Sequence, residues 1–417
     1  MKQDFITAID LGSSGARAVA VEFRSPEERP TVIAAAEAPL AGVRRGTVVN
    51  AEEAAEGLRA VLREIRIQSG APVSEVICSL SGTDLVSRSS RGVVVVGRGD
   101  GEITSDDVDR VLTAASAVSI PPNKEIIEII SRDFIVDDQK GIGDPLGMKG
   151  VRLEVDAAII DVSTQSVRAV EEALAAAEAE ATETVAAPLA AAEAVLSGQQ
   201  KELGVVLIDI GAGTTSLVVY EEGKFVHAAV LPVGAAHITN DLAIGLRTDI
   251  KVAEKVKLRY GTALVETVDR REQCDLSSID PREEGLVWRY HIAEIISARM
   301  EEIFTLVQKE LDKIGKAELL PAGAVLVGGG AKLPHIVPLA KARLKLPVRI
   351  ASPAGFGGIS DRTDDPRYAV VLGLVRHALR EDSPTRSSVG RGAVGSVFGR
   401  VGKAGRRVRS LLDRFLP

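Results

Sequence analysis

The chain of 417 residues has little cysteine, few aromatic side chains and no long apolar run. Its two cysteines, Cys78 and Cys274, lie far apart, so we expect neither a disulfide framework nor a CxxC metal site. A reducing cytoplasm fits this usage best. No stretch of about 18 apolar residues could span a bilayer, and the first residues lack the basic and apolar regions of a signal peptide. We therefore expect a chain that neither crosses the membrane nor is secreted through it.

Familiar catalytic signatures are also missing. No Cys–His pairing suggests a nucleophile, and the sequence contains no G-x-S-x-G turn. Five histidines occur without metal-ligand spacing, and they are His227, His237, His291, His335 and His377. Hydrolase chemistry that depends on such groups is therefore not expected.

Charge is distributed unevenly along the chain. The whole chain has a formal charge of −7, but residues 391–417 carry seven basic side chains against one acidic, a net of +6, which leaves −13 for the rest. An acidic body would repel phosphates over most of its surface, so nucleic acid is not expected as a partner. With 45% hydrophobic residues, the body can bury substantial cores and is long enough for several subdomains.

One pattern occurs twice. Residues 5–23 and 204–226 each show an apolar strand, an Asp-Leu/Ile-Gly turn with small or hydroxylic residues, and a second apolar strand. The aspartates are Asp10 and Asp209. Helical patterns follow each copy, at 51–68, 164–178 and 187–196, and the Ala-rich stretch 171–196 predicts a helix pair. The repeat indicates duplicated α/β domains.

The region 81–161 between the two copies has a different pattern. It predicts a strand, a helix capped by Thr104 or Ser105, and then two more strands, which together indicate a small inserted subdomain. From residue 381 a polar Gly/Ser/Pro-containing stretch without periodicity predicts a flexible linker to the basic tail.

Glycine-rich turns suggest what the repeats do. An aspartate at a strand end followed by glycine can place backbone N–H groups around a phosphate, while the carboxylate holds Mg²⁺ through water. The first turn alone is better explained as an ordinary hairpin. A third glycine loop after an apolar strand, in "AVLVGGGAKLPHI" at 324–336, makes that explanation less satisfactory. Three such loops predict a nucleotide held between two lobes.

At this point the chain resembles the actin-like ATPase superfamily, and within it the FtsA family. The resemblance runs from about residue 5 to residue 379, and its most specific stretches are "GTVVNAEE", "EITSDDVDRVL", "DPLGMKGVRLEV", "PVGAAHITNDLAIGLRT" and "LLPAGAVLVGGGAKLP". It implies an α/β, actin-like two-lobed fold of duplicated ribonuclease H-like domains, with an inserted small α+β subdomain (1C) and a C-terminal amphipathic helix. It also implies a division protein that binds ATP with Mg²⁺, forms filaments with itself through 1C, and tethers the FtsZ C-terminal tail to the cytoplasmic face of the membrane at the division septum.

The resemblance further implies the subdomain limits. Subdomain 1A would take residues 1–80 and 162–196 with a return segment 366–380, and 1C would take 81–161. Subdomain 2A would take 197–241 and 303–365, and 2B would take 242–302. Residues 381–393 would be the linker, and 394–417 the membrane-targeting helix.

Site residues follow from the resemblance, position by position. Asp10 and Asp209 would hold Mg²⁺ through water, and Arg299 would bind the FtsZ tail. Glu254 and Lys257 match a pair that contacts ribose and base, although an i,i+3 ion pair on a solvated helix explains them as well. The cofactor positions are Asp10, Gly12, Ser13, Ser14, Asp209, Gly211, Ala212, Gly213, Thr214, Thr215, Gly234, Glu254, Lys257, Gly328, Gly329, Gly330 and Lys332.

The chain departs from the family pattern at five positions, which are Gly15, Ala187, Ala212, Ser216 and Ala235. Related ATPases often place a glutamate at the position of Ala187 to orient the attacking water, and its loss removes a positioning effect worth orders of magnitude in rate. We therefore expect ATP binding with weak or absent hydrolysis, with Asp209 and Thr214 as the remaining catalytic candidates. The backbone cradle tolerates Ala212 only with a negative φ.

The tail has a seven-residue apolar repeat, formed by Val394, Val401, Val408 and Phe415. Such a stripe predicts an amphipathic helix that lies in the lipid interface, with basic side chains flanking it. Three interior glycines make the alternative, a coiled coil, a poor one. The side chains expected to enter the membrane are Val397, Phe398, Val401, Val408, Leu411, Leu412 and Phe415.

Two other functions remain open at this level. A PilM-like scaffold of pilus assembly has the same fold and an inserted subdomain. A small-molecule kinase of the superfamily would need a substrate pocket and a catalytic carboxylate beyond those assigned to Mg²⁺. The sequence leaves open whether the chain is the main division protein or a divergent paralogue.

Overall fold

The computed structural model describes residues 4–23, 29–97, 99–117, 120–283, 285–359 and 363–381. The expected linker 381–393, apart from Glu381 at the end of α11, and the expected membrane-targeting helix 394–417 lie outside the described residues. Within those ranges no helix combines the length and the apolar character needed to span a bilayer. The chain divides into two compact units, one formed by residues 1–85 and 165–377, and one that includes residues 86–164.

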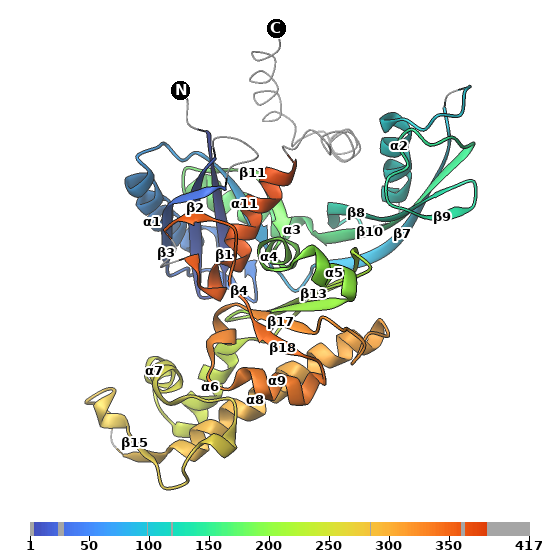
Figure 1. The fold of residues 1–417 in the computed structure, drawn as a ribbon. Coiled ribbons are helices and arrows are strands. Elements are labelled where there is room, and N and C mark those ends of the chain that lie inside the picture. Colours follow the sequence, from blue (N-terminus) through green and yellow to red (C-terminus); the bar gives the residue numbers. More distant parts are fainter. Residues whose placement is uncertain are drawn as a thin grey trace. The chain divides into compact units, whose positions relative to one another are not determined.

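The first unit contains two lobes, each built on its own sheet (Figure 1). The sheet of lobe I has six strands in the order β11-β6-β1-β2-β3-β19. Its strands are β1 (Asp4–Gly12), β2 (Gly15–Phe23), β3 (Thr31–Ala38), β6 (Glu75–Leu80), β11 (Glu180–Ala186) and β19 (Gly357–Gly358). β1, β2 and β3 are antiparallel neighbours, whereas β6 runs parallel to β1.

Helices cover the sheet of lobe I. α1 (Ala51–Ser69) packs against β2 and β3 with a buried face that includes Leu58, Leu62 and Ile65. Its first turn begins at Asn50, whose side chain accepts hydrogen bonds from two backbone amides, as an N-cap should. The other helices are α3 (Thr164–Ala176), α4 (Ala187–Val195) and α11 (Ala369–Glu381), the last preceded by the 3₁₀ helix η4 (Pro366–Tyr368).

Both helices expected in and beside the Ala-rich stretch are confirmed as α3 and α4, but an unexpected strand, β11, separates them. β11 pairs in parallel with β6 and extends the sheet of lobe I. Alanine and glutamate favour helix in isolation, but Thr182, Thr184 and Val185 suit a strand, and pairing with β6 satisfies their backbone groups. Tertiary pairing here overrides local propensity.

Lobe II repeats the strand order of lobe I in a five-stranded sheet, β14-β13-β12-β17-β18. Its strands are β12 (Val205–Ile210), β13 (Thr215–Glu221), β14 (Lys224–Leu231), β17 (Ala324–Val327) and β18 (Val348–Ile350). Its helices are α5 (Gly198–Leu203), α6 (Ala235–Leu246), α7 (Ile250–Tyr260), α8 (Arg289–Lys313) and α9 (Ile336–Leu344). The long helix α8 buries Met300, Phe304 and Val307 in a core shared with the strands.

Several short elements join these parts. A hairpin of β4 (Val43–Arg44) and β5 (Thr47–Val48) precedes α1, and a hairpin of β15 (Gln273–Asp275) and β16 (Leu286–Trp288) precedes α8. The 3₁₀ helices are η1 (Val265–Thr267), η2 (Leu276–Ser278) and η3 (Gly329–Lys332), of which η3 follows β17 directly.

The second unit is a four-stranded antiparallel sheet of order β7-β10-β8-β9 with helix α2 packed on it. Its elements are β7 (Val86–Val95), α2 (Ser105–Ser116), β8 (Lys124–Val136), β9 (Gln139–Ile142) and β10 (Arg152–Ser163). It has its own core around Ile103, Phe134 and Leu153. Thr104 is the N-cap of α2, and its backbone amide donates to Asp107 Oδ2 at 2.9 Å.

Candidate functional site

The three glycine loops meet in one cavity of about 610 Å³ between the two sheets of the first unit. Most of the expected site residues line it, namely Asp10, Gly12, Ser13, Ser14, Asp209, Gly211, Ala212, Thr214, Glu254, Lys257, Gly328, Gly329, Gly330 and Lys332. Ala187, the position of the missing glutamate, lines it as well. The remaining three, Gly213, Thr215 and Gly234, do not line the cavity, and Thr215 is fully buried.

Asp10 is held in place by polar neighbours. It lies near the end of β1, where the Ser79 hydroxyl of β6 donates to Asp10 Oδ1 at 2.7 Å. Arg17 is directly opposite it on β2. Burial raises the pKa of the Asp10 carboxyl, while Arg17 and Ser79 act in the opposite direction. The position of the Asp10 carboxylate is therefore fixed, but its buried negative charge destabilises the fold.

Asp209 occupies the matching place at the end of β12, with Ser216 opposite it on β13 and Val327 opposite it on β17. Burial, and secondarily the charge of Asp10, raise the pKa of Asp209 to about 7, while Arg17 lowers it. Gly328 has φ +82°, and a Cβ there would lie 2.1 Å from Asp209 Oδ1. The third glycine loop thus leaves room for this carboxylate.

The two hairpin loops approach each other closely. A Cβ at Gly213 would lie 2.5 Å from Ser13 Oγ, so only glycine fits between the loops. Ala212 has a negative φ, which meets the condition for an alanine in the cradle. The backbone amides of Ala235 and Ala236 donate to the carbonyl oxygens of Gly211 and Ala212, both at 2.9 Å, and tie the second loop to α6.

The ribose and base candidates lie on the lobe II side. Lys257 Nζ donates to Glu254 Oε2 at 2.6 Å and to Thr239 Oγ1 at 2.8 Å, so the i,i+3 ion pair forms and also reaches α6. Lys257 is mostly buried and Glu254 is partly exposed, and both line the cavity. Lys332 ends η3 and forms an ion pair with Asp365 at 2.6 Å.

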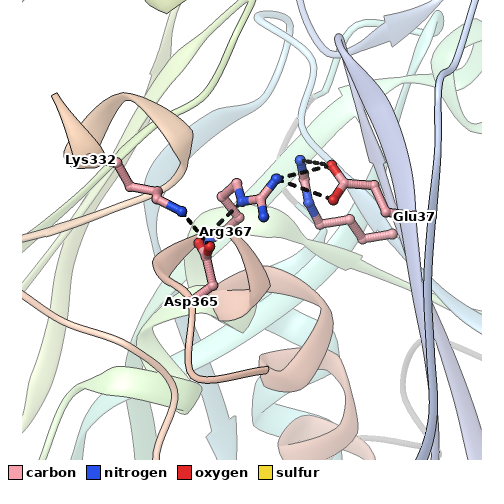
Figure 2. A network of polar contacts seen from close by, with 5 residues as sticks. Glu37, Lys332, Asp365 and Arg367 are labelled. Carbon is pink, nitrogen blue, oxygen red and sulfur yellow. Dashed lines mark hydrogen bonds and ion pairs between the residues drawn. The ribbon is translucent and has the colours of Figure 1, made fainter. Parts of the chain in front are cut away.

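Sequence reasoning missed a charged wall of this cavity. Arg17, Glu37 and Arg367 all line it, and Figure 2 shows Arg367 reaching toward Glu37 while Asp365 joins Arg367 to Lys332. Arg17 could have been found, because its place in the first hairpin is opposite Asp10. Arg367 lies far from the loops in sequence, so no local motif indicates it.

Arg299 is not part of the cavity. It lies on α8, where its Nε and Nη2 atoms donate to the two carboxylate oxygens of Asp241 on α6 at 2.6 and 2.8 Å, and it also contacts Glu302. This bidentate pair fixes the guanidinium between two helices of lobe II.

Family comparisons agree with the fold and with the insertion. The model of "Cell division protein FtsA" matches residues 206–373, and the model of "SHS2 domain inserted in FTSA" matches residues 82–161. The cell division protein FtsA of Neisseria meningitidis serogroup B is 35% identical over 380 residues, which cover 91% of this chain and 91% of that protein.

Solved structures show the same fold at low identity. The PilM–PilN type IV pilus biogenesis complex matches with a TM-score of 0.65 and 20% identity, covering 91% of this chain and 99% of that one. MreB5 of Spiroplasma citri, solved with ADP, matches with a TM-score of 0.51 and 14% identity, covering 93% and 99%. The expected actin-like fold with an inserted α+β subdomain is confirmed. The identity to FtsA proteins over nearly the whole chain shows that it belongs to the FtsA family of cell-division proteins, within the actin-like ATPase superfamily.

Proposed function

We propose that this chain binds ATP with Mg²⁺ in the cavity between its lobes and, as a filament, tethers FtsZ to the cytoplasmic face of the membrane at the division septum. The observation that carries the first part is the convergence on one cavity of three glycine loops and two aspartates, the buried Asp10 and the partly buried Asp209. The bound ADP of the MreB5 structure supports the choice of an adenine nucleotide for this fold. Membership of the FtsA family favours this function over a pilus scaffold or a small-molecule kinase.

The aspartates suit a divalent cation. Burial raises the pKa of both, and the charge of Asp10 raises the pKa of Asp209 further. A cation between them would remove this cost, so Asp10 and Asp209 would hold Mg²⁺ through water. Ser13, Ser14 and Thr214 supply hydroxyls and backbone N–H groups for the phosphates, while Lys257 and Lys332 would face ribose and base.

Nucleotide binding is tested by thermal stability. Mg-ATP at about 100 times its Kd should stabilise the fold by about 2.7 kcal/mol. Asp209→Ala should abolish this gain. Asp161→Ala, which removes a fully buried aspartate from the other unit, should keep it. An unchanged melting temperature with Mg-ATP, or an undiminished gain in Asp209→Ala, would contradict the assignment.

Hydrolysis should be slow. Ala187 begins α4 at the cavity wall and has no carboxylate to orient a water. Ala187→Glu should raise phosphate release at least tenfold if position 187 is the only missing part. No increase, with Mg-ATP binding intact, would show that the account of the missing carboxylate is incomplete.

Filament formation is proposed through the inserted unit. Val95 on β7 and Val151 beside β10 are 67% and 70% exposed, and the amide of Val96 donates to the carbonyl of Val151, so the two lie close together. Val95→Glu with Val151→Glu should abolish sedimentation of filaments with Mg-ATP. The control is Ile67→Glu, at an equally exposed site on α1. Filaments that persist in the double variant would place the contact elsewhere.

Binding of the FtsZ tail is proposed at Arg299. Arg299→Glu would place a third carboxylate beside Asp241 and Glu302 and should weaken binding of a tail peptide, more strongly at low salt. Arg343→Glu is the matched control, because Arg343 also forms an ion pair in lobe II, with Glu301. Equal affinity of Arg299→Glu and the wild type would remove Arg299 from the site.

Membrane binding is proposed for the amphipathic stripe of the tail. Insertion of Phe398, Leu411 and Phe415 could contribute up to about 1.5–3 kcal/mol each, and each basic residue near anionic lipid adds about 1 kcal/mol. Sedimentation with anionic liposomes should therefore recover the full chain but not a chain ending at Gly392. Phe415→Glu should also reduce binding. Equal recovery of the long and short chains would contradict the tether.

A further inference from the structure

Five charged side chains form a continuous row along the cavity wall (Figure 2). At one end Lys332 Nζ lies 2.6 Å from Asp365 Oδ2, and Asp365 Oδ1 lies 3.2 Å from Arg367 Nε. Arg367 Nη1 then lies 3.2 and 3.4 Å from the two oxygens of Glu37. Glu37 Oε1 in turn accepts from Arg17 Nη2 at 2.6 Å. Every step in the row joins opposite charges.

The row runs from one lobe to the other. Lys332 ends the glycine loop η3 of lobe II, whereas Glu37 and Arg17 are opposite each other on β3 and β2 of lobe I. Arg367 lies on η4, which follows β19 of lobe I in sequence and contacts η3 and β17 of lobe II, and Asp365 caps that turn. The contact between Arg367 and Glu37 therefore joins η4, which contacts η3 and β17 of lobe II, to β3 in the sheet of lobe I.

The charges of Asp365 and Arg367 persist at neutral pH. Hydrogen bonds from Lys332 and from Arg367 outweigh the effect of partial burial and lower the pKa of Asp365 to about 2. The carboxylates Asp365 and Glu37 raise the pKa of Arg367. Arg17, the most buried member, is opposite Asp10 on the neighbouring strand and lowers the pKa of both Asp10 and Asp209. The row thus connects the expected metal carboxylates to the expected base site.

We propose that Glu37 and Arg367 are positioning residues of the nucleotide cavity: their ion pair fastens lobe I to lobe II and thereby sets how long a bound nucleotide stays. The inference rests on the proposed binding of Mg-ATP, but the contact itself does not. Glu37 also holds Arg17, so loss of Glu37 would release Arg17 and Arg367 at once.

The direction in which Glu37→Gln changes the rate of nucleotide release distinguishes this role from a simple electrostatic one. Glu37 is a negative charge on the wall of a cavity proposed to hold polyphosphate. If it acted only through its charge, Glu37→Gln would reduce repulsion, free two arginines and slow nucleotide release. If it fastens the lobes, the same substitution opens the cavity and speeds release.

The first test uses the protein without nucleotide. Hydrogen–deuterium exchange should report on segment 328–332 and segment 365–368, which are joined by a hydrogen bond from the Gly328 amide to the Pro366 carbonyl at 3.1 Å. Glu37 lies in lobe I, outside both segments. Its replacement by glutamine should nevertheless make the amides of both segments exchange about two to five times faster, as expected for loss of partly exposed ion pairs. Unchanged exchange in both segments would overturn the proposal whether or not the chain binds ATP.

The second test measures release of a fluorescent ATP analogue with Mg²⁺ after mixing with excess ATP. Glu37→Gln and Arg367→Gln should each release it about two to five times faster, and the double variant should be no faster than either. Slower release by Glu37→Gln would overturn the proposal in favour of simple electrostatics, and additive effects would show that the two residues act separately. A wild-type chain that binds no analogue contradicts the proposed function, and the exchange test then decides the lobe contact.

Two further variants distinguish positioning from general loss of structure. Glu301→Gln breaks an ion pair of similar exposure within lobe II, with Arg343, and should leave exchange and release unchanged. Arg367→Lys keeps the charge and should restore most of the slow release that Arg367→Gln loses. If Glu301→Gln has the same effect as Glu37→Gln, the row has no special role.

Discussion

The two lobes repeat one strand arrangement but surround their aspartates differently. Across the sheet of lobe I, the row of neighbouring positions reads Ser79, Asp10, Arg17 and Glu37. Across the sheet of lobe II, the corresponding row reads Val327, Asp209, Ser216 and Val230. The first aspartate has polar or charged neighbours along the whole row, whereas the second has an apolar side chain on one side.

Because of this difference, the two copies of the motif give their aspartates different properties. Ser79 and Arg17 favour the charged form of Asp10 and orient it. Asp209 lacks such a donor, so burial and the charge of Asp10 bring its pKa to about 7. We therefore expect the carboxylate of lobe II to be the one whose charge responds to pH and to a bound cation.

The largest expected effect comes from filling the space beside Asp209. Gly328→Ala would force a side chain onto φ +82° and within 2.1 Å of Asp209 Oδ1. Strain and overpacking together should lower the free energy of unfolding by about 3 kcal/mol, measured by urea denaturation. Gly315→Ala is the matched control, because Gly315 has φ +66° and no atom within 4 Å of its Cβ position. Equal losses would show that the cavity is less constrained at Asp209 than the structure indicates.

The second prediction concerns pH without Mg²⁺. Because the folded pKa of Asp209 lies above the unfolded value of 3.8, its contribution to stability is complete below pH 4 and is lost as pH rises to about 7. Asp209→Asn avoids this loss. At pH 8 its free energy of unfolding should therefore exceed that of the wild type by on the order of 2 kcal/mol. Asp10→Asn should gain less, because it weakens the contact with Ser79. A larger gain in stability for Asp10→Asn than for Asp209→Asn would show that the charge of Asp10, and not that of Asp209, is the more destabilising one.

The third prediction removes the donor from lobe I. The Ser79 hydroxyl donates to Asp10 and accepts from the buried Leu11 amide at 3.2 Å. Ser79→Ala leaves both groups without this partner and should cost about 1–2 kcal/mol at pH 8. The loss should shrink at low pH, where Asp10 is protonated, and Mg-ATP should reduce it. A loss that does not change with pH would mean that Asp10 does not depend on Ser79 for its charge.

The smallest effect is expected from giving lobe II the donor that it lacks. Val327→Thr places a hydroxyl opposite Asp209 and should lower the pKa of that carboxyl by roughly half a unit to one unit. The pH at which the Asp209 contribution disappears should move down by the same amount. Val325→Thr is the control, since Val325 lies on the same face but opposite Leu207. A shift of equal size in the control would contradict a local effect.

Much of the fold follows from local pattern. The two Asp–Gly hairpins, the glycine loop after β17 and three strands and the helix of the inserted unit are each encoded within a short segment, because alternation and turn residues act over neighbouring positions. The short strand β9 of that unit was not expected. The negative φ of Ala212 likewise agrees with the stated condition for the cradle. Where the signal was compositional, as in the Ala-rich stretch, it missed β11, whose backbone bonds come from β6 more than 100 residues away.

The sequence by itself determined that two aspartates and three glycine loops exist, and resemblance to FtsA indicated which of them belong together. Only the tertiary structure decided what surrounds them. Ser79 meets Asp10 because β6 runs beside β1, and Arg367 meets Glu37 across 330 positions of sequence. Burial and the charges of distant residues, which set the pKa of Asp209 and the contact between the lobes, depend on three-dimensional distance, and no local pattern records it.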